Sequence, residues 1–294
     1  STNDQTRIIL EENTFKNLTY FLVPKEYRGL TRQRNYGVDK ASETSDMIAF
    51  VDDDTELTPN YFEELVRTFV ADKTIFGVGG VALNENSWVL TEPNKQYNKY
   101  HFFQFDKFVY KEGQRNVVRN YVGLQSNLVP GKMPDYSHGR TCGFPLDGKI
   151  YKVDLLIGMS FAFRKIVFDS IQFSSYFEGY GLYEDADFSI RALQFGSNVI
   201  NTKVQLNHYH DPSGRPNQYQ YGKMVVRNGW YVWRTKNPTP TFTHQFKWHS
   251  ITILLTLIRF SNTFTTHKRK QALTEALGRT VGWWSLIFNE PKEN

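Results

Sequence analysis

The chain has 294 residues and a mass of 34.4 kDa, enough for one large α/β domain with an appendage or for two modest domains. Apolar residues make up 40% and charged residues 22%, a composition that excludes wholesale disorder and fibrous repeats. Aromatic residues, at 16%, are the outlier. Rings of this kind line protein cores, but also sugar-binding and membrane-facing surfaces.

The cysteine content and the charge distribution bear on location and partners. A single cysteine, Cys142, cannot form an internal disulfide, which favours a reducing compartment such as the cytoplasm. The longest apolar run, residues 251–264, contains Arg259 and is too short to span a membrane. From Lys203 onward there are 13 Lys and Arg residues against 4 Asp and Glu residues. This basic third suggests an anionic partner: lipid headgroups, a phosphorylated substrate or nucleic acid.

The first part of the chain predicts alternating strands and helices. Strands are expected at 18–23, 47–51 and 75–83, and helices at 33–42 and 61–70, the second with Thr58 as N-cap and Pro59 as its first residue. The run 47–51 is almost continuously apolar and is stopped by three aspartates, as in a buried parallel strand that ends at a polar rim. This order predicts α/β layering.

The remaining chain predicts an insertion, a second set of α/β elements and a basic extension. Residues 84–152 are aromatic and punctuated by Gly and Pro, and are expected to form an inserted loop region. A strand over 153–163, a helix over 184–194 closed by Gly196 and a strand over 198–206 follow. Beyond residue 210 the pattern indicates helices that pack on the preceding domain.

The first candidate site is the acidic triplet Asp52, Asp53 and Asp54 at the end of the 47–51 strand. Open α/β sheets bind their ligands at the carboxyl ends of strands. Carboxylates at positions i and i+2 can bind one hard cation, Mg²⁺ or Mn²⁺, which keeps positions open for a diphosphate. The alternative is a solvated acidic turn that caps the next helix.

The second candidate site is Glu184 and Asp185, at the start of the 184–194 helix. Acidic residues in a first turn often serve only the helix dipole. Gly179 and Gly181 nevertheless let the backbone approach a ligand, and one of these carboxylates could act as a general base. Asp187 and Arg191, spaced i and i+4, are expected to form a structural pair.

The third candidate is the pair His208 and His210, which alternation along a strand places on one face. A neutral imidazole could complete the coordination of a cation held by the aspartates. A hydrogen-bonded histidine at the rim of the sheet is the alternative.

These ordered motifs resemble those of glycosyltransferase family 2, whose members have the GT-A fold. Residues 31–37 (TRQRNYG) resemble a helix start of that family, and 48–54 (IAFVDDD) its strand ending in a D-x-D motif. Residues 158–165 (GMSFAFRK) resemble the donor-side strand and 181–191 (GLYEDADFSIR) the acceptor-side helix. The resemblance extends from residue 1 to about 237, and we expect a GT-A catalytic domain over 1–237 and a helical extension over 238–294.

The resemblance implies an inverting transfer of a sugar from a nucleoside-diphosphate sugar to a hydroxyl acceptor. Asp54 and Asp52 would hold the divalent cation with His210, or else His208, as third ligand, and Asp185 beside Glu184 would deprotonate the acceptor. The donor would contact these residues of the motifs: Arg34, Asn35, Asp52, Asp53, Gly158 and Met159. We expect a UDP-, GDP- or dTDP-sugar as donor and a glycan or lipid-linked acceptor in cell-surface polysaccharide synthesis.

Family members normally begin with a strand, a helix and a second strand, and here the first residues resemble the loop after that unit. The expected domain is therefore N-terminally truncated. A non-catalytic sugar- or nucleotide-binding scaffold and a sugar nucleotidyltransferase stay open as alternatives, whereas no recognised nucleic-acid module accompanies the basic third. We expect this region, including Lys268, Arg269 and Lys270, to rest on the anionic inner face of a membrane.

Overall fold

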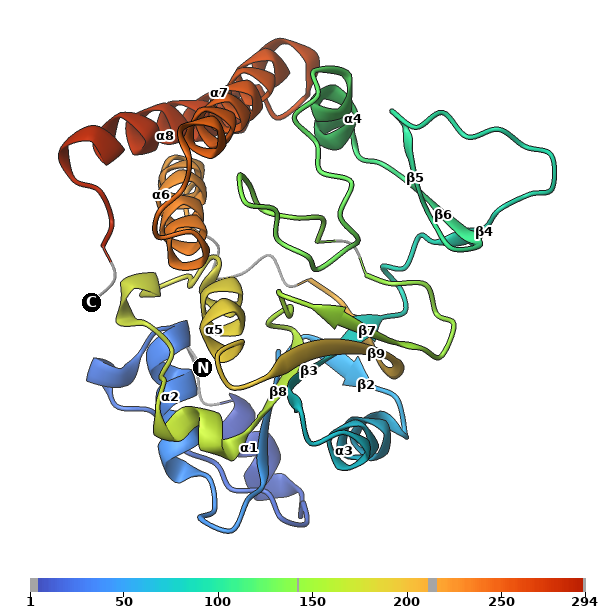
Figure 1. The fold of residues 1–294 in the computed structure, drawn as a ribbon. Helices are drawn as coiled ribbons and strands as arrows, with labels where there is room; N and C mark the ends of the chain where they lie inside the picture. Colours follow the sequence, from blue (N-terminus) through green and yellow to red (C-terminus); the bar gives the residue numbers. More distant parts are fainter. Residues whose placement is uncertain (1–4, 142, 211–215, 293–294) are drawn as a thin grey trace.

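The computed structural model describes residues 5–141, 143–210 and 216–292, and shows a mixed sheet flanked by helices, with three long helices at one end (Figure 1). The expected α/β class is therefore confirmed. Cys142, from which a reducing compartment is inferred, lies outside the described residues. None of the described helices is long and apolar enough to cross a bilayer.

The elements follow in chain order. They are α1 (Gln5–Glu12), η1 (Lys25–Tyr27), α2 (Leu30–Lys40), β1 (Met47–Val51), β2 (Thr55–Leu57), α3 (Tyr61–Ala71), β3 (Ile75–Ala82), β4 (Val89–Leu90), β5 (Phe102–Phe105), β6 (Phe108–Lys111), α4 (Gln114–Tyr121), β7 (Ile150–Val153), β8 (Ser160–Arg164), η2 (Lys165–Asp169), η3 (Ser175–Phe177), α5 (Glu184–Ala192), β9 (Ser197–His208), α6 (Gln218–Lys236), α7 (Phe242–Thr265) and α8 (Arg269–Phe288).

The main sheet has the strand order β1-β8-β3-β9-β2. Strand β7 also pairs with β9, over residues 198–201. Strand β8 runs antiparallel to both β1 and β3, while β3 and β9 are parallel. Strands β1, β3 and β9 therefore run in the same direction, and their carboxyl ends meet at one edge of the sheet.

The two faces of the sheet are covered by different helices. Phe161 and Phe163 of β8 pack with Phe188 of α5, whereas the intervening Ala162 packs with Leu65 of α3. This alternation is that of a strand buried on both faces. The sheet thus holds α3 on one side and α5 on the other (Figure 1).

Three local predictions are wrong. Residues 18–23, all of them described, form no strand, and both Leu18 and Leu22 are exposed because no neighbouring strand covers this segment. The strand expected over 153–163 divides into β7 and β8 around an irregular segment. The helix after Pro59 begins at Tyr61 with Asn60 as N-cap, since the Thr58 hydroxyl donates instead to the Gln205 carbonyl at 2.9 Å.

The inserted region is more ordered than a loop. It contains a small antiparallel sheet, β4-β6-β5, followed by α4. The Trp88 ring packs against the rings of Phe103, Phe105 and Tyr110, which accounts for part of the aromatic excess. Sequence periodicity misses these elements because each strand has at most four residues.

The three long helices α6, α7 and α8 confirm the helical character of the end of the chain. Glycines let α6 and α8 approach closely: a Cβ on Gly278 would lie 2.0 Å from the Tyr219 carbonyl oxygen, and one on Gly222 would lie 2.2 Å from that of Glu275. The boundary at residue 237 stays a prediction, and α6, which precedes it, packs on α8, which follows it.

We expect Gly278→Ala to lower the free energy of unfolding by about 1–3 kcal/mol, because the added methyl group overpacks the contact between α6 and α8. Gly37→Ala is the matched control, since the position is helical and nothing lies within 4 Å of its Cβ. It should be neutral or stabilise by up to about 1 kcal/mol. Urea unfolding measures both variants, and equal effects would contradict the close contact.

Candidate functional site

The ends of three parallel strands bring acidic and imidazole side chains to one edge of the sheet. Asp52, Asp53 and Asp54 follow β1, Glu85 follows β3, and His208 ends β9. The Tyr209 amide donates to the Asp54 carbonyl at 2.9 Å, which fixes the acidic turn against the end of β9. Three separate parts of the sequence therefore meet at this edge.

The structure brings Asp52, Asp54 and His208 together as a possible cation site. One ligand atom of each lies within 4.8 Å of the others, and His208 Nε2 is 3.3 Å from Asp54 Oδ1. Two carboxylates and an imidazole suit Mn²⁺ or Mg²⁺. All three side chains are partly buried, so a cation there could still reach a ligand in the neighbouring hollow.

His210, the preferred third ligand in the sequence, lies in a different group. It joins Glu85 and His208: Glu85 Oε1 is 2.7 Å from His210 Nε2 and 2.8 Å from His208 Nδ1. His208 consequently points one ring nitrogen at Asp54 and the other at Glu85. The geometry favours His208, the alternative kept open in the sequence, as the partner of the aspartates.

Arg34 of α2 is the central cation of the site. Its side chain is buried, and its guanidinium carbon lies 4.8 Å from the Phe161 ring centroid. It donates to the Glu184 carboxylate and to the Gly158 carbonyl at 3.2 Å, and lies 3.5 Å from Asp52 Oδ1. One side chain thus ties α2 to the end of β1, the loop before β8 and the start of α5.

Glu184 and Asp185 begin α5 and have different environments. The preceding Tyr183 has φ 72° and Gly181 also has φ 72°, a left-handed turn that swings the helix start toward Arg34. Glu184 is buried against Arg34, whereas Asp185 is only partly buried. The Asp185 carboxylate accepts hydrogen bonds from the amides of Gly158 at 2.9 Å and Ala186 at 2.8 Å, which orient it.

Burial dominates the electrostatics of this cluster. It raises the pKa of Glu184 to about 8, against the opposing charge of Arg34 and with the help of Asp185. Burial also raises the pKa of Asp52, again opposed by Arg34, while Asp54 adds to the rise. A bound cation or proton would relieve the repulsion among these carboxylates.

The two acidic clusters line one hollow. A cavity of about 480 Å³ is lined by Asp52, Glu184 and Asp185, together with Arg34 and both histidines. A second cleft of about 730 Å³ reaches from the three aspartates toward the C-terminal helices. Segments more than a hundred positions apart therefore face a common space, as expected if both act on the same ligand.

The other residues expected to bind the donor lie in different settings. Gly158 lines the 480 Å³ cavity, and a Cβ there would lie 3.1 Å from Arg34 Nη2, so the position has little room for a side chain. Met159 lines the same cavity from a largely buried position. Asp53 is exposed and lines the larger cleft. Asn35 instead exchanges two hydrogen bonds of 2.9 Å with the Phe173 backbone.

Glu85 is a site residue that sequence reasoning missed. It lies just beyond the carboxyl end of β3, where the rule that selects Asp52 and His208 would also have selected it. Its contacts with both histidines identify it as part of the site.

The structural pair expected between Asp187 and Arg191 is confirmed: Arg191 Nη2 donates to Asp187 Oδ2 at 2.5 Å.

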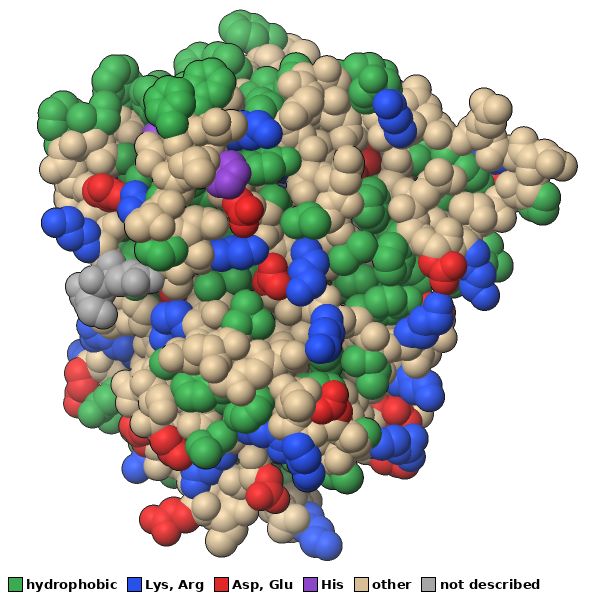
Figure 2. Space-filling model, in the orientation of Figure 1, with side chains coloured by type: hydrophobic (Ala, Val, Ile, Leu, Met, Phe, Trp, Pro, Cys, Tyr) green, Lys and Arg blue, Asp and Glu red, His purple; other side chains and the backbone are tan. Residues whose placement is uncertain are grey.

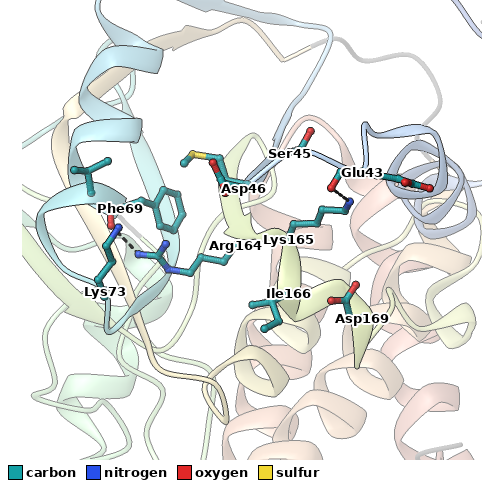
Figure 3. A pocket seen from close by; sticks show the side chains of 11 residues that line it. Glu43, Ser45, Asp46, Phe69, Lys73, Arg164, Lys165, Ile166 and Asp169 are labelled. Carbon is teal, nitrogen blue, oxygen red and sulfur yellow. Dashed lines mark hydrogen bonds between the residues drawn. The ribbon is translucent and has the colours of Figure 1, made fainter.

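A third hollow, of about 530 Å³, lies at the opposite end of β1 (Figure 3). Two of its cations have backbone partners: Arg164 donates to the Phe69 carbonyl at 2.7 Å, and Lys165 to that of Glu43 at 2.9 Å. Those cations fasten α3 and the turn before β1 to the start of η2. This hollow is distinct from the acidic edge, which lies at the other end of β1.

The fold is of GT-A type, with a mixed sheet, flanking helices and an acidic strand end. A family model described as glycosyl transferase family 2 matches residues 1–124 of the 294-residue chain. The matched segment contains Arg34 and the three aspartates, whereas Glu184, Asp185 and His208 follow it. A search of the curated proteins returns no match.

We expect Glu184→Gln to change the pH dependence of stability. The pKa of Glu184 is raised in the folded state, so its contribution is full below about pH 4.5 and is lost as the pH rises through about 8. Between pH 5 and pH 9 the wild type should therefore lose at least about 1 kcal/mol relative to the variant. Denaturant unfolding across this range measures the difference.

Glu63→Gln is the control for that measurement, because Glu63 is exposed on α3 and pairs with Arg67 across one helical turn. Its stability difference from the wild type should change little over the same range. A difference between wild type and Glu184→Gln that is also independent of pH would contradict the raised pKa.

Proposed function

We propose that the protein is a metal-dependent inverting glycosyltransferase, which moves a sugar from a nucleoside-diphosphate sugar to an acceptor hydroxyl. The observation that carries this proposal is that Asp52 and His208, which form a candidate cation site with Asp54, line the same cavity as Asp185. The match of residues 1–124 to the glycosyl transferase family 2 model supports the reaction class. The donor set suits Mn²⁺ or Mg²⁺, and such a cation would neutralise charge on a departing diphosphate.

Asp185 is the proposed general base. Its carboxylate is held by two backbone amides and keeps lone pairs for one further hydrogen bond. In the proposed step the acceptor oxygen forms a bond to the anomeric carbon and its proton passes to Asp185. The bond from that carbon to the diphosphate breaks, and the diphosphate leaves with the bonding electrons.

Arg34 and Glu184 act as positioning residues in this proposal. Their hydrogen bond is buried, and Arg34 reaches both the Gly158 carbonyl and Asp52. Removal of either partner would leave a buried polar group without its hydrogen bond and displace both walls of the cavity. A uridine, guanosine or thymidine diphosphate sugar fits the proposal, as does a glycan or lipid-linked acceptor of cell-surface polysaccharide.

We expect Asp185→Asn to lower transfer by at least about 10²-fold while nucleotide binding persists, because the amide cannot take up the proton. Asp54→Ala should instead weaken nucleoside-diphosphate binding in Mn²⁺, with little effect in its absence. Diphosphate release from a panel of nucleotide sugars measures the first effect and calorimetry the second. The exposed Asp39 of α2 offers a matched control, Asp39→Asn, which should retain both properties.

Full turnover by Asp185→Asn would overturn the assignment of the base. Binding of nucleotides by the wild type with no transfer from any donor of the panel would instead favour a non-catalytic scaffold. Loss of both properties in Asp39→Asn would indicate a general folding defect and contradict the site assignment.

We also propose that the protein binds peripherally to an anionic membrane surface on the cytoplasmic side. Six large apolar residues of α7 are exposed, and at 100° per residue they fall within about 60° of arc: Phe242, Phe246, Ile253, Leu257, Phe260 and Phe264. Four exposed residues of α8 repeat the pattern: Leu277, Val281, Trp284 and Phe288. Figure 2 shows hydrophobic side chains gathered over the end of the molecule where these helices lie.

A lipid surface is the proposed occupant because cations adjoin this apolar face. Lys268, Arg269 and Lys270 are exposed at the turn between α7 and α8. Each basic residue near an anionic membrane contributes about 1 kcal/mol, and a narrow apolar stripe can enter the acyl boundary. The two features together match an interfacial helix pair.

We expect the double variant Phe246→Asp and Leu257→Asp to lose flotation with phosphatidylcholine–phosphatidylglycerol vesicles. Val66→Asp with Val70→Asp is the control, because these two apolar residues are also exposed on one helix, α3. Changing Lys268, Arg269 and Lys270 to Glu should abolish the dependence on phosphatidylglycerol. Equal flotation of all variants would contradict the proposed surface.

A further inference from the structure

The 730 Å³ cleft has two walls of opposite charge. One wall is the acidic turn, with Asp52, Asp53 and Asp54. The other is formed by the helices beyond the catalytic sheet and carries Arg115 of α4 and Arg259 of α7. The proposed reaction uses only the acidic wall, so the arginines have no role in it so far.

The basic wall has more positive than negative charge. Glu275 of α8 is buried between two arginines: its Oε1 lies 2.9 Å from Arg279 Nη2, and its Oε2 lies 2.7 Å from Arg259 Nε. The second contact is an ion pair without the geometry of a hydrogen bond, so Arg259 Nε has no hydrogen-bond partner. One carboxylate thus serves two guanidinium groups.

Arg115 adds a third guanidinium to this wall. Among the residues that the structure describes, it forms neither a hydrogen bond nor an ion pair, and its side chain is exposed to the cleft. Partial burial and the nearby Arg279 lower its pKa, and Glu275 only partly offsets them. An anion that entered the cleft would therefore be stabilised by charge that the protein leaves uncompensated.

We infer that Arg115 and Arg259 bind a phosphate group on the acceptor, an inference that rests on the proposed glycosyl transfer. Guanidinium groups bind phosphate oxygens through paired, charge-assisted hydrogen bonds. The acidic wall across the cleft repels a bare phosphate and accepts one only through a cation. In this proposal the donor diphosphate binds at the acidic wall through a cation, and a second phosphate binds at the basic wall.

The position of α7 identifies the acceptor as the source of that phosphate. Arg259 lines the cleft, while Leu257 and Phe260, its near neighbours along the helix, are exposed in the apolar stripe. A single helix thus presents a cation to the cleft and apolar side chains to the surface. This arrangement fits an amphiphilic molecule with an apolar chain and a phosphate, which carries the acceptor hydroxyl toward Asp185.

Binding of decyl phosphate, a soluble single-chain phosphate, tests the site without donor or cation. We expect Arg115→Gln to weaken its binding about tenfold by calorimetry, as for the loss of one charge-assisted hydrogen bond. Arg115→Lys should recover part of the loss, and Arg259→Gln should repeat the effect. Arg67→Gln on α3 is the matched control, and decyl maltoside, which has no charge, should bind all variants equally.

Binding of nucleoside diphosphates in Mn²⁺ by the same variants is the second arm, and it should stay within about twofold of the wild type. Unchanged decyl phosphate binding by Arg115→Gln, or a loss confined to nucleoside diphosphates, would overturn the inference. Because decyl phosphate is measured without donor or transfer, failure of this site is distinguishable from failure of the proposed reaction.

Discussion

The buried contact between Arg34 and Glu184 is the interaction on which the candidate site depends. Arg34 lies beneath aromatic rings, where a lone guanidinium would be costly, and Glu184 lies where a lone carboxylate would be costly. Their pairing, extended to the Gly158 carbonyl and toward Asp52, fixes α2, the end of β1, the loop before β8 and the start of α5 relative to one another. The acidic cavity exists because these four segments cannot move apart independently.

Neighbouring carboxylates have different tasks in this arrangement. Glu184 is buried and bonded to Arg34, so its carboxyl group serves the architecture, whereas Asp185 is turned toward the cavity by two backbone amides. Asp52 faces Arg34, while Asp54 lies beside His208. The environment of each acid, more than its type, decides whether it holds the fold together or faces a ligand.

The C-terminal helices lie next to the acidic edge of the sheet and pack against the segment before α5. Glycines bring α6 and α8 into backbone contact, and the Asn228 side chain of α6 donates to the Leu182 carbonyl just before α5 at 2.8 Å. Helices α7 and α8 carry the exposed apolar stripes, and α7 also carries Arg259 of the larger cleft. The chemistry proposed for the acidic edge and the surface proposed for the membrane are thereby joined through one packed unit.

The sequence by itself determined the α/β class, the resemblance to glycosyltransferase family 2, the strand of residues 47–51 and the acidic turn after it, because these depend on apolar patterning and on local motifs. The sequence also identified Arg34 and Asp185 as candidate site residues. Tertiary structure alone decided that His208 lies with Asp52 and Asp54 while His210 lies with Glu85, that Asn35 holds the Phe173 backbone, and that residues 18–23 pair with no strand. The reason is physical: these outcomes depend on side-chain distances and strand partners between segments far apart in the chain, which a one-dimensional pattern does not contain.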